Sequence, residues 1–291
     1  MKLAILGSLN RNYEEIRLLE EGKKLFDTVS YFPIPQVVIE TNGNGSKLTF
    51  KNKNLADYDV ILPRIPRTYK NFGTAIIEAL FYLGKKLPLE PWSIIASHNK
   101  FLTLVRLAEK GIPIPETHLS LKRSVLESVF DDMTYPLVLK LLYGSKGVGV
   151  MFADSKQSAV SIMDALERFN EPMFVESFIP PGNEDIRAYV IGNKVVASMK
   201  RVAKDDERRA NIGMGGEGFL YKLSSEEKNL ALKSAKAMGT KICGVDIMSS
   251  PDGPVIIETN VNAQFQGIEK ATKKNVAKQI LKYLKGEIRE K

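Results

Sequence analysis

The apolar and polar positions of the first ninety residues alternate in blocks that predict a small α/β unit. Residues 2–6 have an apolar strand pattern, a helical pattern follows, and residues 26–39 favour a second strand region interrupted by prolines. A third apolar run ends at Arg64, and residues 71–83 have helical periodicity. Strands alternating with helices indicate a mostly parallel sheet, in which ligands gather beyond the carboxyl ends of the strands. Arg64 lies at such an end, either as a surface residue or as a substrate contact.

Two prolines and the apolar run WSIIAS, which we interpret as a short strand, indicate a domain boundary near residue 90. A helix predicted over 99–110 carries Lys100 in its first turn, where a cation is unfavourable unless an anion lies close by. The run PLVLK then places Lys140 inside an otherwise apolar strand. Because burial of an unpaired ammonium is costly, Lys140 requires a carboxylate or a phosphate partner.

A glycine-rich loop follows Lys140 directly. Gly144, Gly147 and Gly149 let the backbone approach a ligand closely and present N–H groups to an anion. The spacing lacks the G-x-x-x-x-G-K-[ST] pattern, and the loop opens onto a strand instead of a helix, so a P-loop is excluded. We interpret the segment as a glycine-rich lid between two strands.

The second half of the chain predicts several strands and helices around one long loop. Ser224 and Glu227 have the spacing of a capping box, and Gly192-Asn193 is typical of a two-residue hairpin turn. The loop is glycine-rich and basic, as mobile functional loops often are. In chain order the expected elements are the helix 157–169, the strands 173–181, 185–192 and 194–202, the loop 205–218, a helix from 224 to Gly239, the hairpin 242–260 and a helix over 268–286.

Acidic and amide side chains interrupt the apolar hairpin near its carboxyl end. Its turn is Ser-Pro-Asp-Gly, and Glu258, Asn260 and Asn262 share one face of the second strand because strand side chains alternate. The hairpin can bring Asp246 to the same place from the first strand. Hard oxygen ligands of this kind suit Mg²⁺, including a pair of ions ~3.5–4 Å apart. The alternative is an exposed polar face on an edge hairpin.

Bulk composition narrows the class of protein without choosing its ligand. The 291 residues suffice for two or three modest domains, and 42 basic against 34 acidic residues give a formal charge of +8, which favours anionic ligands. One cysteine excludes an internal disulfide and a cysteine-rich zinc cluster, and two histidines disfavour a histidine metal site or a Ser-His-Asp triad. Apolar runs are too short for a membrane span, so we expect a cytoplasmic enzyme or binding protein.

The motifs, taken in order, resemble the ATP-grasp superfamily and, within it, the RimK-type amino-acid ligases. They are Lys100, the strand lysine Lys140, the glycine-rich lid, VESFI, DIR, RAN, Asp246 and Glu258-x-Asn260, and the resemblance covers nearly the whole chain. It implies an α/β (α+β) ATP-grasp fold of three subdomains, with ATP held between two β-sheets and a small α/β amino-terminal domain. We place the subdomains at 1–92, 93–175 and 176–291.

The resemblance also assigns roles to individual residues. The implied ATP contacts are Lys100, Lys140, Gly144, Ser145, Gly147, Asp185, Arg209 and Asn211, with Glu176, Ser177, Phe178 and Ile179 forming the segment beside the adenine. Arg187, Arg209 and Lys140 are the implied catalytic cations at the transferred phosphate. Asp246, Glu258 and Asn260 are implied to hold two Mg²⁺ ions, with Mn²⁺ as an alternative, and Arg64 and Asn262 to face the substrate.

Two segments depart from the family pattern. Relatives often carry Asp-Lys where this chain has Asn99-Lys100. They also commonly carry a Ser-Pro-Gly type sequence after the metal-binding Asn, where this chain has the residues 261–265, VNAQF. The second segment borders the substrate pocket, so the resemblance leaves the metal site intact but does not identify the acceptor.

The implied reaction is ATP-dependent ligation of a carboxylate to an amine through an acyl phosphate. By resemblance the amine belongs to L-glutamate and the acceptor is a small cofactor tail of the tetrahydromethanopterin or deazaflavin type. A ribosomal protein terminus or an amino-group carrier protein is the alternative acceptor. A nucleotide-dependent small-molecule kinase is the alternative of another class. A nucleic-acid-binding module is disfavoured, because this chain lacks the interleaved exposed aromatic residues on which bases stack. We expect no membrane partner and leave open a homo-oligomer, dimer or tetramer.

Overall fold

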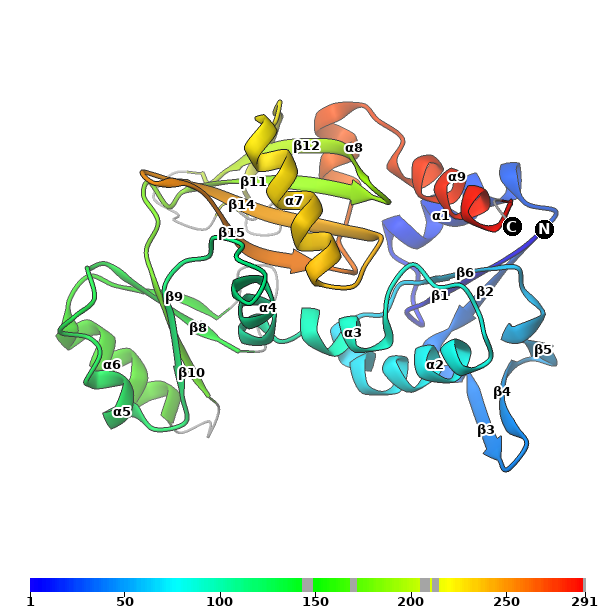
Figure 1. The fold of residues 1–291 in the computed structure, drawn as a ribbon, viewed down its shortest axis with the longest axis horizontal. Coiled ribbons are helices and arrows are strands. Elements are labelled where there is room, and N and C mark those ends of the chain that lie inside the picture. Colours follow the sequence, from blue (N-terminus) through cyan, green and yellow to red (C-terminus); the bar gives the residue numbers. More distant parts are fainter. Residues whose placement is uncertain (143–148, 168–171, 205–209, 211–214, 290–291) are drawn as a thin grey trace.

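The amino-terminal part of the chain forms a parallel sheet with the strand order β2-β1-β6, flanked by helices (Figure 1). The computed structural model describes residues 1–142, 149–167, 172–204, 210 and 215–289. The elements of this sheet are β1 (Lys2–Gly7), α1 (Tyr13–Leu25), β2 (Thr28–Pro33), β6 (Val60–Pro63) and α2 (Lys70–Tyr82). The predicted parallel sheet is therefore confirmed, and Arg64 directly follows the carboxyl end of β6.

A small antiparallel sheet extends from the edge of this unit. It contains β3 (Val38–Asn42), β4 (Gly45–Phe50) and β5 (Lys53–Asn54), and short 3-10 helices η1 (Ile34–Gln36), η2 (Leu55–Asp57) and η3 (Arg67–Tyr69) connect the neighbouring elements. The sheet projects away from the rest of the molecule in Figure 1.

A second sheet, with the order β7-β10-β8-β9, is antiparallel throughout. Its region contains α3 (Pro91–Ser97), α4 (Lys100–Ala108), β7 (Thr117–Ser120), α5 (Arg123–Glu127), β8 (Leu137–Leu141), β9 (Val150–Ala153), α6 (Lys156–Glu167) and β10 (Met173–Ser177). The prediction of a strand at WSIIAS is wrong, because these residues form α3 with Pro91 at its start. Proline is favoured in the first helical turn, where its missing N–H leaves no bond unmade.

The third sheet has the order β13-β12-β11-β14-β15 and is also antiparallel. Its elements are β11 (Glu184–Ile191), β12 (Lys194–Val202), β13 (Glu217–Leu220), α7 (Ser225–Ala237), β14 (Ile242–Ser250), β15 (Gly253–Asn260), α8 (Gln266–Thr272) and α9 (Val276–Arg289). The predicted capping box at Ser224 and Glu227 is confirmed. The single helix expected over 268–286 is wrong, because Lys273 adopts a left-handed conformation (φ 57°) that ends α8 before α9 begins.

Apolar packing ties the first and third sheets together and leaves the second with a core of its own. One cluster combines Leu3 and Leu18 of the amino-terminal unit with Tyr189, Phe265 and Ile280 of the carboxy-terminal unit. Helix α9 lies beside α1 in Figure 1 and contributes to this cluster. The core of the second sheet is separate and includes buried residues of α5, β8, β9 and α6. The second sheet also packs against the third, because Phe174 of β10 belongs to a buried cluster that includes residues of β11 and β14.

A helix that spans a bilayer needs about 20 consecutive, mostly apolar residues. Within the described residues, none of the helices combines the length and apolar character required to span a membrane.

Candidate active site

Charged side chains gather on one face of the five-stranded sheet. In the strand register Arg187 of β11 lies opposite Asp246 of β14, and Asp246 lies opposite Glu258 of β15. On the other side of β11, Asp185 lies opposite Arg201 of β12. Residues directly opposite each other share a face, and so do residues two apart on one strand. The fold therefore brings all five side chains to the same face, as the sequence predicted for Asp246 and Glu258.

Four of these side chains form a buried ionic cluster. Arg187 donates two hydrogen bonds to Asp246, from Nε to Oδ1 at 2.7 Å and from Nη2 to Oδ2 at 2.6 Å. Arg201 bridges the two aspartates, with Nη2 at 2.6 Å from Oδ2 of Asp185 and 2.9 Å from Oδ2 of Asp246. The Arg201 and Asp246 side chains are only 2% exposed, whereas that of Arg187 is 12% exposed. Arg187 is thus the member of the cluster that borders the open face.

Burial and pairing act in opposite directions on the two aspartates. Burial disfavours the charge of Asp246, but Arg187 and Arg201 outweigh it and lower the pKa of Asp246 to about 2. For Asp185 burial prevails, together with repulsion from Asp246, and the pKa is raised despite the pairing with Arg201. Arg201 was missed from the sequence because its strand runs into a basic segment. A usable signal existed, since Arg201 follows the apolar residues Ala197 and Met199 at alternate positions and so falls on the apolar face of its strand.

The strand lysine of the second sheet has the carboxylate partner that its burial requires. Lys140 of β8 forms an ion pair with Glu176 of β10, and its ammonium lies 5.7 Å from the centre of the Phe174 ring. Glu176 is 4% exposed, and in the part of the chain that the structure describes its Oε2 atom has no hydrogen-bond partner. A buried carboxylate oxygen without a partner is unfavourable, so it marks a place where a ligand donor group fits.

Lys100 lies where the second and third sheets meet. Burial lowers its pKa, and its charge interacts with Glu258 of β15 and with Lys140 and Glu176 of the second sheet. Helix α4, which carries Lys100, also contacts the second sheet through an edge-on pair of Phe101 and Phe174 rings, 6.0 Å apart. The predicted nucleotide and metal residues of the two sheets therefore converge on one ammonium group.

The residues predicted to hold metal form an oxygen-only donor set. Glu258 is half-buried beside Asp246, and Asn260 lies two residues further along the same face. The Oδ1 atom of Asn260 accepts the N–H of Asn262 at 2.9 Å. Two carboxylates and one amide fit the preference of Mg²⁺ for hard oxygen ligands. Within the described residues, no group of three or more His, Cys, Asp or Glu side chains offers an alternative metal site.

Arg64 and Asn262, the predicted substrate residues, are brought together from opposite ends of the chain. The Nη2 group of Arg64 donates to the carbonyl of Ala263 at 2.8 Å and to that of Asn262 at 3.4 Å. Arg64 is 3% exposed, and the Nε of Arg64 and the Oδ1 of Asn262 are buried without a partner among the described residues. A buried donor and a buried acceptor that lack partners are groups that a polar substrate would satisfy.

The remaining predicted contacts are only partly described. Ser177 ends β10, where its N–H donates to the carbonyl of Glu116 at 2.9 Å. Phe178 packs edge-on against Phe152 with 6.2 Å between ring centres, and Ile179 is half-buried. The predicted contacts Gly144, Ser145, Gly147, Arg209 and Asn211 lie outside the described residues.

The arrangement of sheets is that of the ATP-grasp ligases. The ATP-grasp ligase PsnB complexed with its minimal precursor superposes with a TM-score of 0.77 over 98% of both chains, at 17% identity. A RimK domain protein from Sphaerobacter thermophilus gives a TM-score of 0.74 over 97% of this chain and 99% of the other, at 18% identity. The D-alanine–D-alanine ligase from Bacillus anthracis gives a TM-score of 0.66 over 100% and 98% of the chains, at 16% identity. The expected ATP-grasp fold is thus confirmed.

Sequence comparisons identify the family within this class. The RimK pre-ATP-grasp domain matches residues 1–91 and the RimK-like ATP-grasp domain matches residues 97–284. Proteins named "Probable alpha-L-glutamate ligase" from Vibrio vulnificus and Legionella pneumophila are 35% and 37% identical over 98% of this chain and 95% of their own length. The chain belongs to the RimK-like ATP-grasp family and is an ATP-dependent ligase.

Replacing Lys140 should weaken nucleotide binding. We expect Lys140→Ala to lower ATP affinity about tenfold to a hundredfold, since a hydrogen bond to a charged group contributes about 1.5–3 kcal/mol. Isothermal titration with a non-hydrolysable ATP analogue measures the change. Lys156→Ala is the matched control, because Lys156 forms an exposed ion pair with Asp131 in the same region. An unchanged affinity in Lys140→Ala would mean that Lys140 serves only as the structural partner of Glu176.

Proposed function

We propose that this protein is an ATP-dependent ligase that joins L-glutamate to a carboxylate acceptor. The observation that carries the proposal is the position of Lys100, whose buried ammonium interacts electrostatically with Glu258 of the third sheet and with Lys140 and Glu176 of the second. Cationic side chains that could bind the phosphates and oxygen atoms that could bind a divalent cation therefore lie on two neighbouring sheets. Transfer of a phosphoryl group requires both kinds of group close together. We take L-glutamate as the amino acid, and an α-linkage as the bond formed, from the name "Probable alpha-L-glutamate ligase" that the relatives carry.

The chemistry proceeds in two steps. A carboxylate oxygen of the acceptor attacks the γ-phosphorus of ATP, the bond to the β-phosphate oxygen breaks, and ADP leaves. The lone pair of the glutamate amine then attacks the carbonyl carbon of the acyl phosphate, the carbon–oxygen bond to phosphate breaks, and a proton passes to solvent. Catalysis of the first step depends mainly on positioning and on charge neutralisation.

The side chains of this chain divide those tasks between them. Lys140 and Arg187 would stabilise negative charge on the phosphates, and Arg187 is suited because it borders the open face while two of its N–H groups remain bonded to Asp246. Arg209, which lies outside the described residues, is proposed for the same role. Arg64 and Asn262 would bind the carboxylate and polar groups of the substrate.

Asp246, Glu258 and Asn260 would hold the divalent cation, because they supply oxygen atoms from one face of the β14–β15 hairpin. When bound, Mg²⁺ supplies neutralisation of the phosphate charges, and we propose two ions. Asp246 would keep its negative charge for this purpose at neutral pH, since its pKa is lowered to about 2.

The acceptor is the molecule whose carboxylate ATP activates. A small cofactor tail was expected from the sequence and stays a prediction, as does the alternative of a protein terminus. PsnB, in contrast, is described in complex with peptide precursors. All of these acceptors share a free carboxylate, and L-glutamate itself carries both groups that the reaction joins.

The proposal is tested by incubating the purified protein with ATP, Mg²⁺ and L-glutamate. We expect ADP release that depends on added glutamate, together with α-linked glutamyl-glutamate detected by mass spectrometry and assigned by NMR. ADP release that is equally fast without any amino acid would contradict ligation, because the phosphoryl group would then pass to water. D-Glutamate tests whether the configuration at the α-carbon matters. L-Lysine, which has no side-chain carboxylate, tests whether that group is required.

A further inference from the structure

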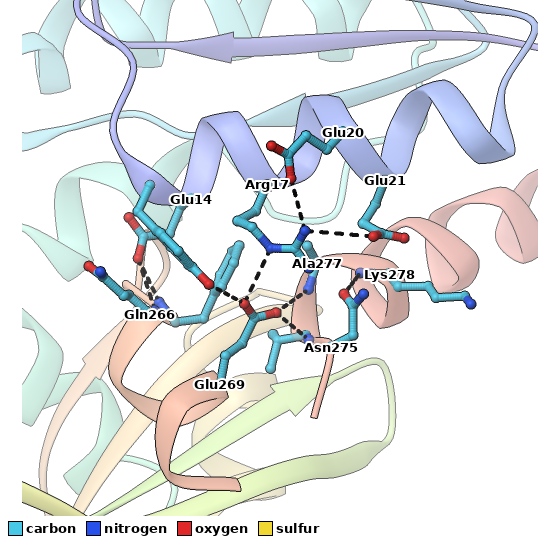
Figure 2. Close-up of polar contacts among 12 residues, drawn as sticks. Glu14, Arg17, Glu20, Glu21, Gln266, Glu269, Asn275, Ala277 and Lys278 are labelled. Carbon is cyan, nitrogen blue, oxygen red and sulfur yellow. Dashed lines mark hydrogen bonds and ion pairs between the residues drawn. The ribbon is translucent and has the colours of Figure 1, made fainter. Parts of the chain in front are cut away.

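Buried glutamates join the amino-terminal helix α1 to the two carboxy-terminal helices. Figure 2 shows Glu14 of α1 pointing to the start of α8, and Glu269 of α8 pointing to the start of α9. Glu14 is 1% exposed, and its Oε1 accepts the N–H groups of Phe265 at 3.0 Å and Gln266 at 3.1 Å. The N-cap residue Phe265 makes no side-chain cap of its own. Helix α8 is therefore capped by a carboxylate from the other end of the chain.

The capped turn belongs to the segment that we place beside the substrate. Strand β15 ends at Asn260, and residues 261–265 connect it to α8. Arg64 binds the carbonyls of Asn262 and Ala263 from one side, while Glu14 binds the N–H groups at the far end of the same segment. The segment is thus held between a buried cation and a buried anion, both supplied by the amino-terminal unit.

Aromatic packing fixes the same segment at its last residue. The Phe265 ring makes edge-on contacts with Tyr13 of α1 at 6.3 Å and with Tyr189 of β11 at 6.2 Å between ring centres. Gly244 lies on the sheet beneath, where an added Cβ would come within 2.7 Å of the Cβ of Ala263. These contacts confine the segment from above and below. The bonds to Arg64 and Glu14 at its two ends then fix its position relative to Arg64.

We propose that Glu14 is a positioning residue for substrate recognition. By holding the amides of Phe265 and Gln266, it sets the distance of residues 261–265 from Arg64, and hence the shape of the surface that receives glutamate. Nucleotide binding uses side chains on the second sheet and on β11, β14 and β15, so it does not depend on this bond. The inference rests on the proposed function.

Glu269 offers a matched control. It is also buried, at 9% exposure, and its Oε1 caps α9 by accepting the N–H groups of Val276 at 2.7 Å and Ala277 at 3.2 Å. Its Oε2 accepts the Tyr13 hydroxyl at 2.8 Å, so the carboxylate joins the same helices as Glu14 does. The backbone bonds of Glu269 are at α9, beyond the far end of α8, and its bond to α1 is made to the Tyr13 hydroxyl and not to the backbone of residues 261–265. Its loss should therefore affect stability without affecting the substrate.

The experiment compares Glu14→Ala and Glu14→Gln with Glu269→Ala and Glu269→Gln. We expect both alanine variants to lower the melting temperature by a few degrees, about the effect of losing a helix cap. Of the two alanine variants, Glu14→Ala alone should raise the KM for L-glutamate, by about tenfold, with the Kd for the ATP analogue unchanged. Glu14→Gln keeps an acceptor oxygen but loses the charge, so it should raise this KM by only about threefold.

Hydrogen exchange separates the capping bond from its functional effect. In Glu14→Ala the backbone amides of residues 261–267 should exchange with solvent faster than in the wild type. In Glu269→Ala the same amides should remain protected. Equal KM values for glutamate in the Glu14 and Glu269 variants, or unchanged protection of 261–267, would overturn the inference. If Glu14→Ala does not fold, the two glutamine variants decide the comparison alone. A wild-type protein without glutamate-dependent ADP release would instead overturn the proposed function, and the inference with it.

Discussion

The Glu258→Gln variant is expected to release ADP about 10²–10³-fold more slowly than the wild type while keeping its melting temperature. Glu258 is half-buried opposite Asp246, and the substitution removes one negative charge from the proposed cation site without changing its size. Glutamine still fills the same space on β15, so the fold should be preserved. A coupled assay of ADP release at saturating ATP and glutamate measures the rate.

Loss of activity alone would not identify a metal ligand, because Glu258 also interacts with Lys100. The decisive readout is the affinity for Mn²⁺, followed by electron paramagnetic resonance in the presence of the ATP analogue. We expect Glu258→Gln to weaken Mn²⁺ binding, and Asp252→Asn, at the exposed turn of the same hairpin, to leave binding and rate unchanged. ADP release at the wild-type rate in Glu258→Gln would remove the metal assignment.

The features that could be predicted from the sequence are those that depend on short stretches of neighbouring residues. The β14–β15 hairpin follows from its Ser-Pro-Asp-Gly turn and its apolar strands, whereas the pairing of Asp246 with Glu258 depends on a register shift between Asp246 and Ile247 that the turn alone does not predict. Lys140 was identified because one ammonium in an apolar strand demands a partner. The sequence left that partner open between a carboxylate and a phosphate, and the structure supplies Glu176.

The features that sequence missed depend on contacts between distant elements. Arg187 and Asp246 are 59 residues apart, and only the order of strands in the sheet places them together. Glu14 looks like an ordinary acidic residue in the first turn of an amphipathic helix, where carboxylates are normally solvated. Its burial results from the docking of α1 on α8 and α9, which no local pattern encodes.

Local ambiguity explains the two errors in secondary structure. The run WSIIAS is six residues long, and periodicity cannot distinguish a buried helix from a buried strand at that length. The break between α8 and α9 falls at Lys273, which adopts positive φ without being glycine, so the usual signal for a helix end was missing. The capping of α9 by Glu269 stabilises the second helix from a residue in the first.

Replacing Arg201 is expected to produce the largest loss of stability. The side chain is 2% exposed between Asp185 and Asp246, and Arg201→Met would leave both carboxylates buried with less compensating charge. Breaking a buried ion pair by removing one partner costs about 3–5 kcal/mol, so the melting temperature should fall on the order of 10 °C. Arg201→Lys should fall between the wild type and Arg201→Met, because an ammonium cannot bridge two carboxylates as a planar guanidinium does.

The neighbouring residue on β12 provides the control for this prediction. Lys200 forms an ion pair of 2.6 Å with Glu184 of β11, but both side chains are about one-third exposed. An exposed pair contributes about 0–1 kcal/mol, so Lys200→Met should leave the melting temperature within a few degrees of the wild type. Differential scanning fluorimetry of the variants measures the difference. Equal stability of Arg201→Met and Lys200→Met would show that Arg187 alone compensates the buried aspartates, and that Arg201 does not stabilise this face of the third sheet.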